Sequence, residues 1–357
     1  MSDRYLVLEN GTTFKGKAFG ADKDVIGEVV FTTAMVGYVE TLTDPSYYGQ
    51  IVTQTFPLIG NYGIIDEDFE SSAPKLFGYI VKTPSDTPSN YRMNGKLDDF
   101  LKQCGIPGLY GIDTRALTKI IREAGVMNGM ITDDLSKVDY EAIRDFSIKN
   151  ALSNVSTPRK YTVGKGDKKV VLLDYGYKGY ILKELLKRDL EVTIMPYYST
   201  AVEILSEKPD GIMLSNGPGD PKENIKSIET LKKLIPHKIP TFGICLGHQL
   251  LALANGFETS KLKYGHRGGN QPCKEIESGK TYITTQNHGY QVVSDSIDPK
   301  IAVESFVNVN DGTCEGINYI NTPAFTAQFH PEAHNGPTDT NFLFDKFVKL
   351  MEVNKCH

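Results

Sequence analysis

Cysteine is sparse in this chain, and its spacing excludes two common uses of the residue. The five cysteines are Cys104, Cys245, Cys273, Cys314 and Cys356, and no two of them form a CxxC pair. An odd number of scattered cysteines argues against a disulfide framework and against a structural zinc site built on thiolates. We therefore expect no metal and a reducing compartment.

Long apolar runs and an excess of basic charge are also lacking. No stretch approaches the ~18 apolar residues that span a membrane, and the apolar run near the N-terminus ends after four residues, at Glu9. The formal net charge of −5 gives no footprint for nucleic acid or for an anionic membrane surface. These absences predict a cytoplasmic protein that binds neither nucleic acid nor membranes.

What the chain does contain divides into two halves with different patterns. Residues 1–155 carry short β-rich runs separated by turns, among them a hairpin signal around Asn10-Gly11. One helix is predicted from Asp113 to Gly125, with Asp113 as N-cap and Leu117, Ile120, Ile121 and Ala124 on one apolar face. The polar, Gly- and Pro-containing stretch over residues 156–168 indicates a linker.

Residues 169–357 alternate strands with helices of about ten residues, a pattern typical of βαβ units around a parallel sheet. Strand-like runs dominate again from Gly279, and a last helix is expected from about Thr338 to Met351. The predicted class is therefore α/β: a β-rich α/β domain followed by a domain with a mixed, mostly parallel sheet. At 357 residues the chain is long enough for two domains, each with its own core.

The segment Gly243-Ile244-Cys245-Leu246-Gly247 has the G-x-nucleophile-x-G spacing of a nucleophile elbow. A predicted strand precedes it and a predicted helix follows it, which is the context that the motif requires. At a helix N-terminus the thiolate is favoured, and the N–H of Leu246 would face an oxyanion. The alternative is a small core cysteine beside two turn glycines, and the motif alone leaves both open.

A thiol nucleophile needs a base, and the chain offers seven histidines. His237 and His357 are expected at the surface, while His334 and His266 are expected in loops. His248 follows Cys245 on the predicted helix and would point away, in a structural role.

His288 and His330 remain as candidates for the base. His330 ends a β-run at His-Pro, which places it at the carboxyl edge of a strand, where α/β sheets carry their sites. Glu332 could hold its second ring nitrogen, giving a Cys–His–Glu triad. The alternative for His330 is a capped strand end with a satisfied imidazole.

The loop from Leu214 to Pro221, "LSNGPGDP", also follows a predicted strand. Its glycines and prolines would fix backbone N–H groups that can hold a small polar ligand or an oxyanion. It lacks the Lys-Ser/Thr of a phosphate-binding P-loop. Taken alone, it could equally be a tight turn.

These segments together resemble the class I, or triad, glutamine amidotransferases: the GPGDP loop, the GICLGHQ elbow and a late HPE. The first half, with "GYVETLTDPSYYGQ" and "GIPGLYGIDTRALTKIIREAG", resembles the N-terminal domain of carbamoyl-phosphate synthase small subunits. The resemblance covers essentially the whole chain. Anthranilate, GMP and aminodeoxychorismate amidotransferases would lack this first domain, and a non-catalytic glutamine-binding scaffold would be expected to lack part of the triad.

The resemblance implies hydrolysis of L-glutamine to glutamate and ammonia through a thioester on Cys245, with His330 as base and then acid and Glu332 orienting it. It implies glutamine contacts for eight further residues: Ser46, Gly217, Gly219, Leu246, Gln249, Asn287, Gly289 and Tyr290. It also implies a partner, a large synthetase subunit that uses ATP, Mg²⁺ and bicarbonate, in a heterodimer or a higher oligomer, with no cofactor in this chain. The carbamoyl phosphate would serve arginine synthesis, pyrimidine synthesis or both.

Two departures from the family pattern stand out. Tyr290 replaces a usual phenylalanine, at a position where backbone contacts are expected to matter. The stretch from Asp174 to Leu185 lacks an asparagine near Tyr180 and an arginine near Lys183. We expect this stretch to lie away from the triad and to bear on packing or on the subunit contact. The many tyrosines of the first domain are expected to supply much of the subunit interface.

Overall fold

The computed structural model describes residues 2–354, so Cys356 and His357 lie outside the described residues. The chain divides into two compact units, Met1–Ala151 and Leu152–His357, and each is described by itself. The exact limits of the functional domains remain a prediction. No helix within residues 2–354 combines the length and the apolar character that a membrane crossing requires.

The first unit is built on a closed barrel in the strand order β1-β2-β8-β6-β4-β3-β9. Its strands are β1 (Asp3–Leu8), β2 (Thr13–Gly20), β3 (Val25–Thr32), β4 (Gln50–Gln54), β6 (Gly78–Val81), β8 (Pro107–Tyr110) and β9 (Met127–Thr132), with a short pair β5 (Leu58–Ile59) and β7 (Thr83–Pro84) beside it. The predicted hairpin is confirmed, because β1 and β2 pair antiparallel across the Asn10-Gly11 turn. Closure of the barrel was not predicted.

Short helices accompany the barrel: α1 (Tyr38–Thr43), α2 (Leu97–Gln103), α3 (Thr114–Ala124) and α4 (Tyr140–Asp145). The α3 prediction is confirmed, with the Asp113 side chain accepting a hydrogen bond from the Ala116 N–H at 2.9 Å. Leu117 and Ile121 of its predicted face are buried, but Ala124, the last residue of the helix, is exposed.

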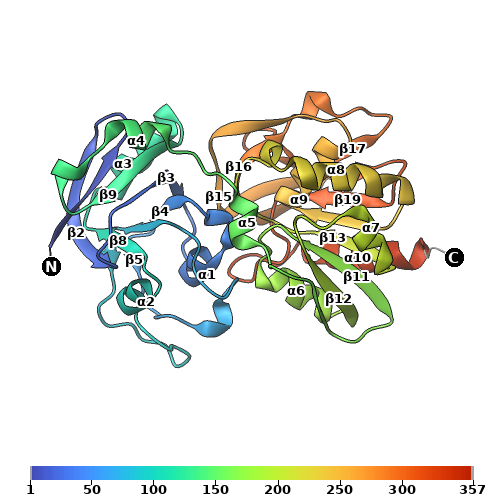
Figure 1. Ribbon diagram of the computed structural model, residues 1–357, viewed down its shortest axis with the longest axis horizontal. Helices are drawn as coiled ribbons and strands as arrows, with labels where there is room; N and C mark the ends of the chain where they lie inside the picture. Colours follow the sequence, from blue (N-terminus) through green and yellow to red (C-terminus); the bar gives the residue numbers. More distant parts are fainter. Residues whose placement is uncertain (1, 355–357) are drawn as a thin grey trace. The chain divides into compact units, whose positions relative to one another are not determined.

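The second unit carries a ten-stranded sheet in the order β10-β12-β11-β13-β14-β19-β18-β17-β15-β16 (Figure 1). The run from β12 to β19 is parallel, and the pairs outside it are antiparallel. The strands are β10 (Tyr161–Val163), β11 (Lys168–Asp174), β12 (Leu190–Pro196), β13 (Gly211–Leu214), β14 (Thr241–Ile244), β15 (Thr259–Glu275), β16 (Thr281–Val292), β17 (Ala302–Asn308), β18 (Cys314–Tyr319) and β19 (Ala324–Ala327). The predicted mixed sheet is confirmed.

The segment expected to be a linker contains structure that the sequence did not reveal. Strand β10 pairs antiparallel with β12 at the edge of the sheet, and helix α5 (Ala151–Val155) precedes it. A three-residue edge strand with half-exposed or exposed side chains has no apolar alternation to signal it. Its pairing with β12 therefore comes from tertiary context.

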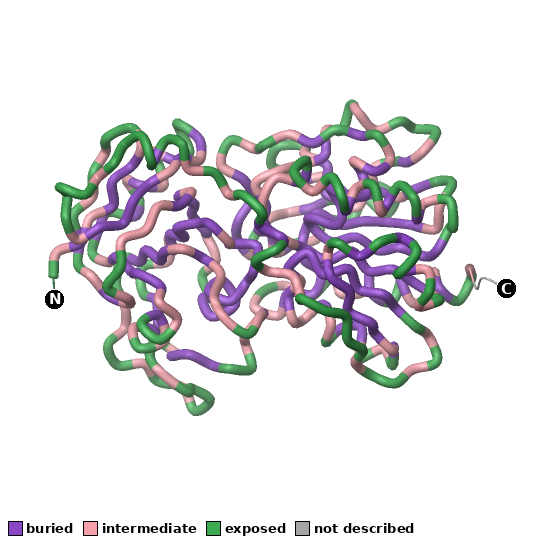
Figure 2. Tube along the Cα trace, viewed as in Figure 1, coloured by how far each residue is buried: buried purple, intermediate pink, exposed green. Residues whose placement is uncertain are grey.

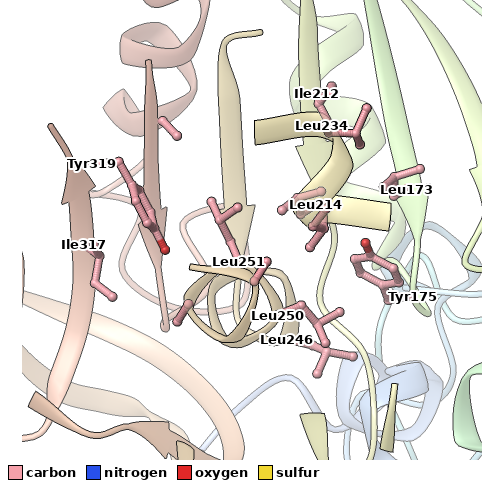
Figure 3. Packing of buried hydrophobic residues seen from close by; sticks show 14 of the residues in the cluster. Leu173, Tyr175, Ile212, Leu214, Leu234, Leu246, Leu250, Leu251, Ile317 and Tyr319 are labelled. Atoms are coloured by element: carbon pink, nitrogen blue, oxygen red, sulfur yellow. The ribbon is translucent and has the colours of Figure 1, made fainter. Parts of the chain in front are cut away.

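Helices cover both faces of this sheet because its strands are apolar on both sides. Leu173 and Ile212 on one face pack with α8 (Ile225–Leu234) and α9 (Leu246–Ala254), a packing that Figure 3 shows around Leu250 and Leu251. Leu172 and Met213 on the other face belong to a second cluster with α6 (Gly179–Leu186) and α10 (Phe342–Val353). A short helix, α7 (Ala201–Ser206), completes the unit. The central strands are accordingly buried almost along their whole length (Figure 2).

Candidate active site

Cys245 lies at the sharp turn between β14 and α9. Its backbone has φ 53° and ψ −102°, a conformation that residues other than glycine rarely adopt. Such a strained conformation persists only where the surrounding structure holds it. Two residues later a side chain cannot be accommodated, since a Cβ on Gly247 would lie 2.4 Å from the Leu214 carbonyl oxygen. The predicted strand–cysteine–helix arrangement is therefore present, with Leu246 as the first helical residue.

His330 follows β19, the parallel neighbour of β14 in the sheet. Its ring Nδ1 lies 2.7 Å from Glu332 Oε1, and both side chains are almost completely buried. A carboxylate only accepts hydrogen bonds, so Nδ1–H donates and Nε2 is the nitrogen left for other chemistry. The pairing of His330 with Glu332 has the geometry of a base and its orienting group.

The Cys245 side chain also influences the pKa of the His330 imidazole. Burial alone would lower the pKa of His330, but the Glu332 charge and the nearby Cys245 side chain outweigh it and raise the pKa to about 10. Nε2 makes no hydrogen bond of good geometry among residues 2–354, so the contact with the thiol is loose in the free protein. Such looseness is common before substrate binds.

Lys178 joins this pair, and it overturns the expectation that the stretch from Asp174 to Leu185 lies away from the triad. Lys178 Nζ is 3.1 Å from Glu332 Oε1, with both side chains buried. Burial would raise the pKa of Glu332, but Lys178 and His330 lower it to about 2. The stretch begins at the carboxyl end of β11 and so meets the same edge of the sheet as His330, which sequence order did not reveal.

The loop after β13 approaches the elbow closely. A Cβ on Gly217 would lie 2.1 Å from the Tyr175 carbonyl oxygen and 2.8 Å from Leu246 Cδ2, so only glycine fits there. The Gly247 N–H donates to the Ser215 carbonyl at 3.0 Å and ties the loop to α9. Gly219 has φ +89°, the left-handed region that favours glycine.

Strand β16 also contacts the cysteine. The Cys245 thiol donates to the Asn287 carbonyl oxygen, with Sγ 3.7 Å from it. The Gln249 amide nitrogen donates to the Tyr290 carbonyl and to Gln328 Oε1, both at 2.9 Å. Tyr290 thus contacts Gln249 through its backbone carbonyl. Gly289 lies between Asn287 and Tyr290 in the strand.

Ser46 belongs to the first unit, in a 3-10 helix over Pro45–Tyr47. Its N–H donates to the Asp44 side chain at 2.9 Å, and the residue is buried. Its predicted contact with glutamine remains a prediction.

The other histidines take different roles. His248 is fully buried with Nδ1 2.8 Å from Thr326 Oγ1, and burial lowers its pKa to about 3, which confirms the structural role predicted for it. His237 is exposed, as predicted. His334 stacks on Tyr180 with ring centroids 3.3 Å apart.

The expectation of a loop at His266 is wrong. This residue lies within β15, is buried, and pairs with His288 across the ladder. The glycines around it suggested a loop, but the ladder instead shows irregular register between Gly268 and Gln271.

Comparison with known protein families identifies the class of protein to which this chain belongs. Residues 171–350 match the family described as glutamine amidotransferase class-I, so the second unit is an amidotransferase domain. Residues 6–131 match the family described as carbamoyl-phosphate synthase small chain, CPSase domain. The chain belongs to the carbamoyl-phosphate synthase small chains.

Individual relatives agree over their whole length. The chain is 49% identical to the carbamoyl phosphate synthase small chain of Listeria monocytogenes serotype 4b, covering 98% of this chain and 97% of that one. It is 52% identical to the small chain of Bacillus thuringiensis subsp. konkukian, over 98% and 96%. It is 50% identical to the pyrimidine-specific small chain of Halalkalibacterium halodurans, over 99% and 98%.

Proposed function

We propose that this chain is the glutamine-hydrolysing subunit of a carbamoyl-phosphate synthase, and that it forms a γ-glutamyl thioester on Cys245. The observation that supports this most directly is the strained Cys245 at the end of β14 beside the His330–Glu332 pair at the end of β19. A reactive thiol, a buried imidazole and an orienting carboxylate at neighbouring strand ends are the parts of a cysteine triad.

The first half of the reaction breaks the amide bond. The Cys245 thiol gives its proton to His330 as its sulfur attacks the side-chain amide carbon of glutamine, and the oxygen of that amide takes the negative charge. The Leu246 N–H at the start of α9 and the backbone around Gly217 are the proposed donors to this oxyanion. The His330 imidazolium then gives its proton to the departing nitrogen, so that ammonia leaves and the thioester remains.

The second half restores the thiol. His330, now neutral, takes a proton from a water molecule that attacks the thioester carbon. The C–S bond then breaks to release glutamate, and His330 returns the proton to the departing sulfur. Glu332 holds Nδ1–H throughout, which keeps Nε2 directed at the reacting atoms. Gln249, Asn287, Gly289 and Tyr290 would position the substrate from β16 and α9, and Gly219 would hold its amino-acid end. Ser46 stays a proposed glutamine contact on the resemblance alone.

Ammonia is the product that the reaction sequence must conserve, because water at pH 7 protonates it. We propose delivery to a large subunit that binds ATP, Mg²⁺ and bicarbonate and makes carbamoyl phosphate, while glutamine hydrolysis in the small chain needs no cofactor. The synthase would be a heterodimer or a multiple of it. The name of one relative, the pyrimidine-specific small chain, favours pyrimidine synthesis as one use, and arginine synthesis is a second use of the same product.

A variant that separates the two ammonia sources tests this assignment. Cys245→Ser in the assembled synthase should reduce glutamine-dependent carbamoyl phosphate formation by about 10³-fold or more while leaving ammonia-dependent formation within a factor of two. If both rates fall together, Cys245 is structural and the proposal is wrong. Glutaminase activity of the purified small chain, with and without the large subunit, supplies the independent measurement.

A further inference from the structure

A second group of buried polar side chains lies on β15, β16 and β18, outside the proposed triad. His266 of β15, His288 of β16 and Glu315 of β18 bring one ligand atom each to within 4.8 Å of the others. All three are buried, with exposed fractions of 8%, 5% and 0%. The glutamine reaction proposed above has no use for these three side chains.

The hydrogen bonds around the two histidines fix which nitrogen each one turns inward. His266 Nε2 is 2.8 Å from Asp311 Oδ2, and His288 Nδ1 is 2.7 Å from the Tyr290 carbonyl oxygen. Both oxygens can only accept, so these nitrogens carry the protons. His266 Nδ1 and His288 Nε2 then present lone pairs to the centre of the group when both rings are neutral.

Two further acceptors lie at this centre, beside one donor, Asn308 Nδ2, which is 3.5 Å from His266 Nδ1. Glu315 Oε1 lies 3.3 Å from His266 Nδ1, and Gln286 Oε1 lies 3.1 Å from His288 Nε2. Glu315 Oε2 is buried and has no hydrogen-bond partner among the residues that the structure describes. The Gln286 amide nitrogen donates elsewhere, to Cys273 Sγ and Thr284 Oγ1, both at 3.2 Å. Converging buried lone pairs repel one another unless a cation lies between them.

We propose that His266, His288 and Glu315, with Gln286 as a fourth ligand, bind a divalent transition-metal ion of the Zn²⁺ class. Tetrahedral Zn²⁺ holds nitrogen and oxygen ligands at about 2.0–2.1 Å, which sets neighbouring ligand atoms about 3.3 Å apart. The two separations just given, 3.3 Å and 3.1 Å, match that spacing. The ligand set of imidazole and carboxylate suits zinc, and the cysteine pattern that excluded a thiolate site has no bearing on it.

A complete outer shell supports the same assignment. Metal-bound histidines usually donate their second N–H to a carboxylate or a backbone carbonyl, and Asp311 and the Tyr290 carbonyl are such partners. Asn308 Nδ2 donates to Glu315 Oε1 at 3.1 Å and orients that carboxylate. Asp311, at 42% exposed, is the partner that lies nearest to solvent.

The rival arrangement puts a proton where the ion would be. Burial lowers the pKa of His266, but hydrogen bonds to Asp311 and Glu315 outweigh it and raise the pKa to about 9. An imidazolium could therefore bridge the two carboxylates without metal. The ion, by contrast, would cross-link β15, β16 and β18 behind the Asn287 carbonyl that meets Cys245.

A direct measurement of metal binding distinguishes a bound metal ion from an imidazolium at His266. The full-length chain, stripped with a chelator, is equilibrated with Co²⁺ and then with Zn²⁺, and bound metal is measured by atomic emission and by the visible absorption of tetrahedral Co²⁺. We expect one ion per chain, with a higher melting temperature in Zn²⁺. Cys245→Ser should bind equally, which separates this site from the catalytic thiol and keeps the test independent of glutaminase activity.

Three variants identify the ligands. Glu315→Gln and His266→Asn should abolish stoichiometric binding, and Asp311→Asn, which removes only an outer-shell partner, should weaken it by about 10- to 100-fold. Glu277→Gln, in the exposed turn between β15 and β16, is the matched control and should bind as the wild type does. Absence of bound Co²⁺ and Zn²⁺ in the wild type, or unchanged binding in all three variants, overturns the proposal in favour of the imidazolium.

Discussion

At the scale of single residues, the buried chain Lys178–Glu332–His330 sets the charge state of the proposed site. Glu332 accepts from His330 at 2.7 Å and pairs with Lys178 at 3.1 Å, so its negative charge is shared between two cationic partners. Breaking a buried ion pair leaves the other charge uncompensated and costs about 3–5 kcal/mol. The three residues therefore couple the stability of the second unit to its chemistry.

Glu332→Gln should move the alkaline limit of glutaminase activity to lower pH. The carboxylate raises the pKa of His330 to about 10, so removing its charge lowers that pKa. Since the imidazolium must protonate the departing nitrogen, kcat/KM falls as pH rises through the His330 pKa, and in the variant it falls earlier. We also expect kcat at pH 7.5 to drop at least about tenfold. A pH profile of kcat/KM with an unshifted alkaline limb would contradict this.

Lys178→Met should shift the same limb in the opposite direction. The Lys178 ammonium lowers the pKa of His330 and is the largest influence that lowers the pKa of Glu332. Without this ammonium, the pKa of His330 rises, so activity extends to higher pH on the alkaline side. The pKa of Glu332 also rises, so its carboxylate is protonated, and activity is lost, at a higher pH on acidification. The free energy of unfolding should fall by about 3 kcal/mol, measured by urea denaturation. Lys183→Met, on the same helix segment but outside this ion pair, is the control for a general loss of positive charge.

At the scale of secondary-structure elements, the elbow depends on close contact between the start of α9 and the end of β13. Gly247→Ala should destabilise the chain by about 1–3 kcal/mol, because the new Cβ would lie 2.4 Å from a backbone oxygen that cannot move aside easily. Glutaminase activity should fall as well, since Leu246 and Cys245 move with the helix. Thermal and urea unfolding supply the measurement.

Gly269→Ala is the matched control for the elbow substitution. A Cβ at Gly269 would meet its nearest neighbour, Thr285 Oγ1, at an ordinary 3.7 Å. Its effect on stability should stay within about 0.5 kcal/mol. Equal destabilisation by the two substitutions would show that the cost at Gly247 does not come from contact with β13.

The same scale shows why the sequence predicted some parts of the site and missed others. The strand–Cys245–α9 turn and the His330-Pro331-Glu332 run are local, and local spacing carries enough chemistry to identify them. Lys178 was missed because its partner Glu332 lies 154 positions away, and only the order of β11, β13, β14 and β19 in the sheet brings them together. Strand β10 was missed for a similar reason, since its pairing with β12 leaves no apolar period in the sequence.

At the scale of the whole molecule, the division into a β-rich unit and an α/β unit could be predicted from the change in periodicity near residue 155. Closure of the first unit into a barrel could not, since it depends on the pairing of β9 with both β1 and β3. The expectation that the many tyrosines of the first domain supply much of the subunit interface was also too broad. Tyr38, Tyr47 and Tyr79 are core residues of the barrel unit, and they are not available to a partner.

The exposed apolar residues of the first unit are the better candidates for a contact with the large subunit. Met35 is 71% exposed, Val36 55% and Tyr91 96%. Apolar and aromatic side chains in the centre of an interface often contribute 2 kcal/mol or more each. We therefore predict that the first unit supplies part of the subunit interface through these residues.

A pair of full-length double variants tests this prediction. Met35→Asp with Tyr91→Asp should weaken binding of the large subunit by at least about 30-fold, which corresponds to about 2 kcal/mol, while the glutaminase activity of the isolated chain stays within a factor of two. Val202→Asp with Ile225→Asp places the same charges on exposed apolar residues of the second unit and serves as control. Affinity is measured by titration of labelled large subunit. Loss of binding in the second pair, with the first pair unaffected, would assign the interface to the amidotransferase unit instead.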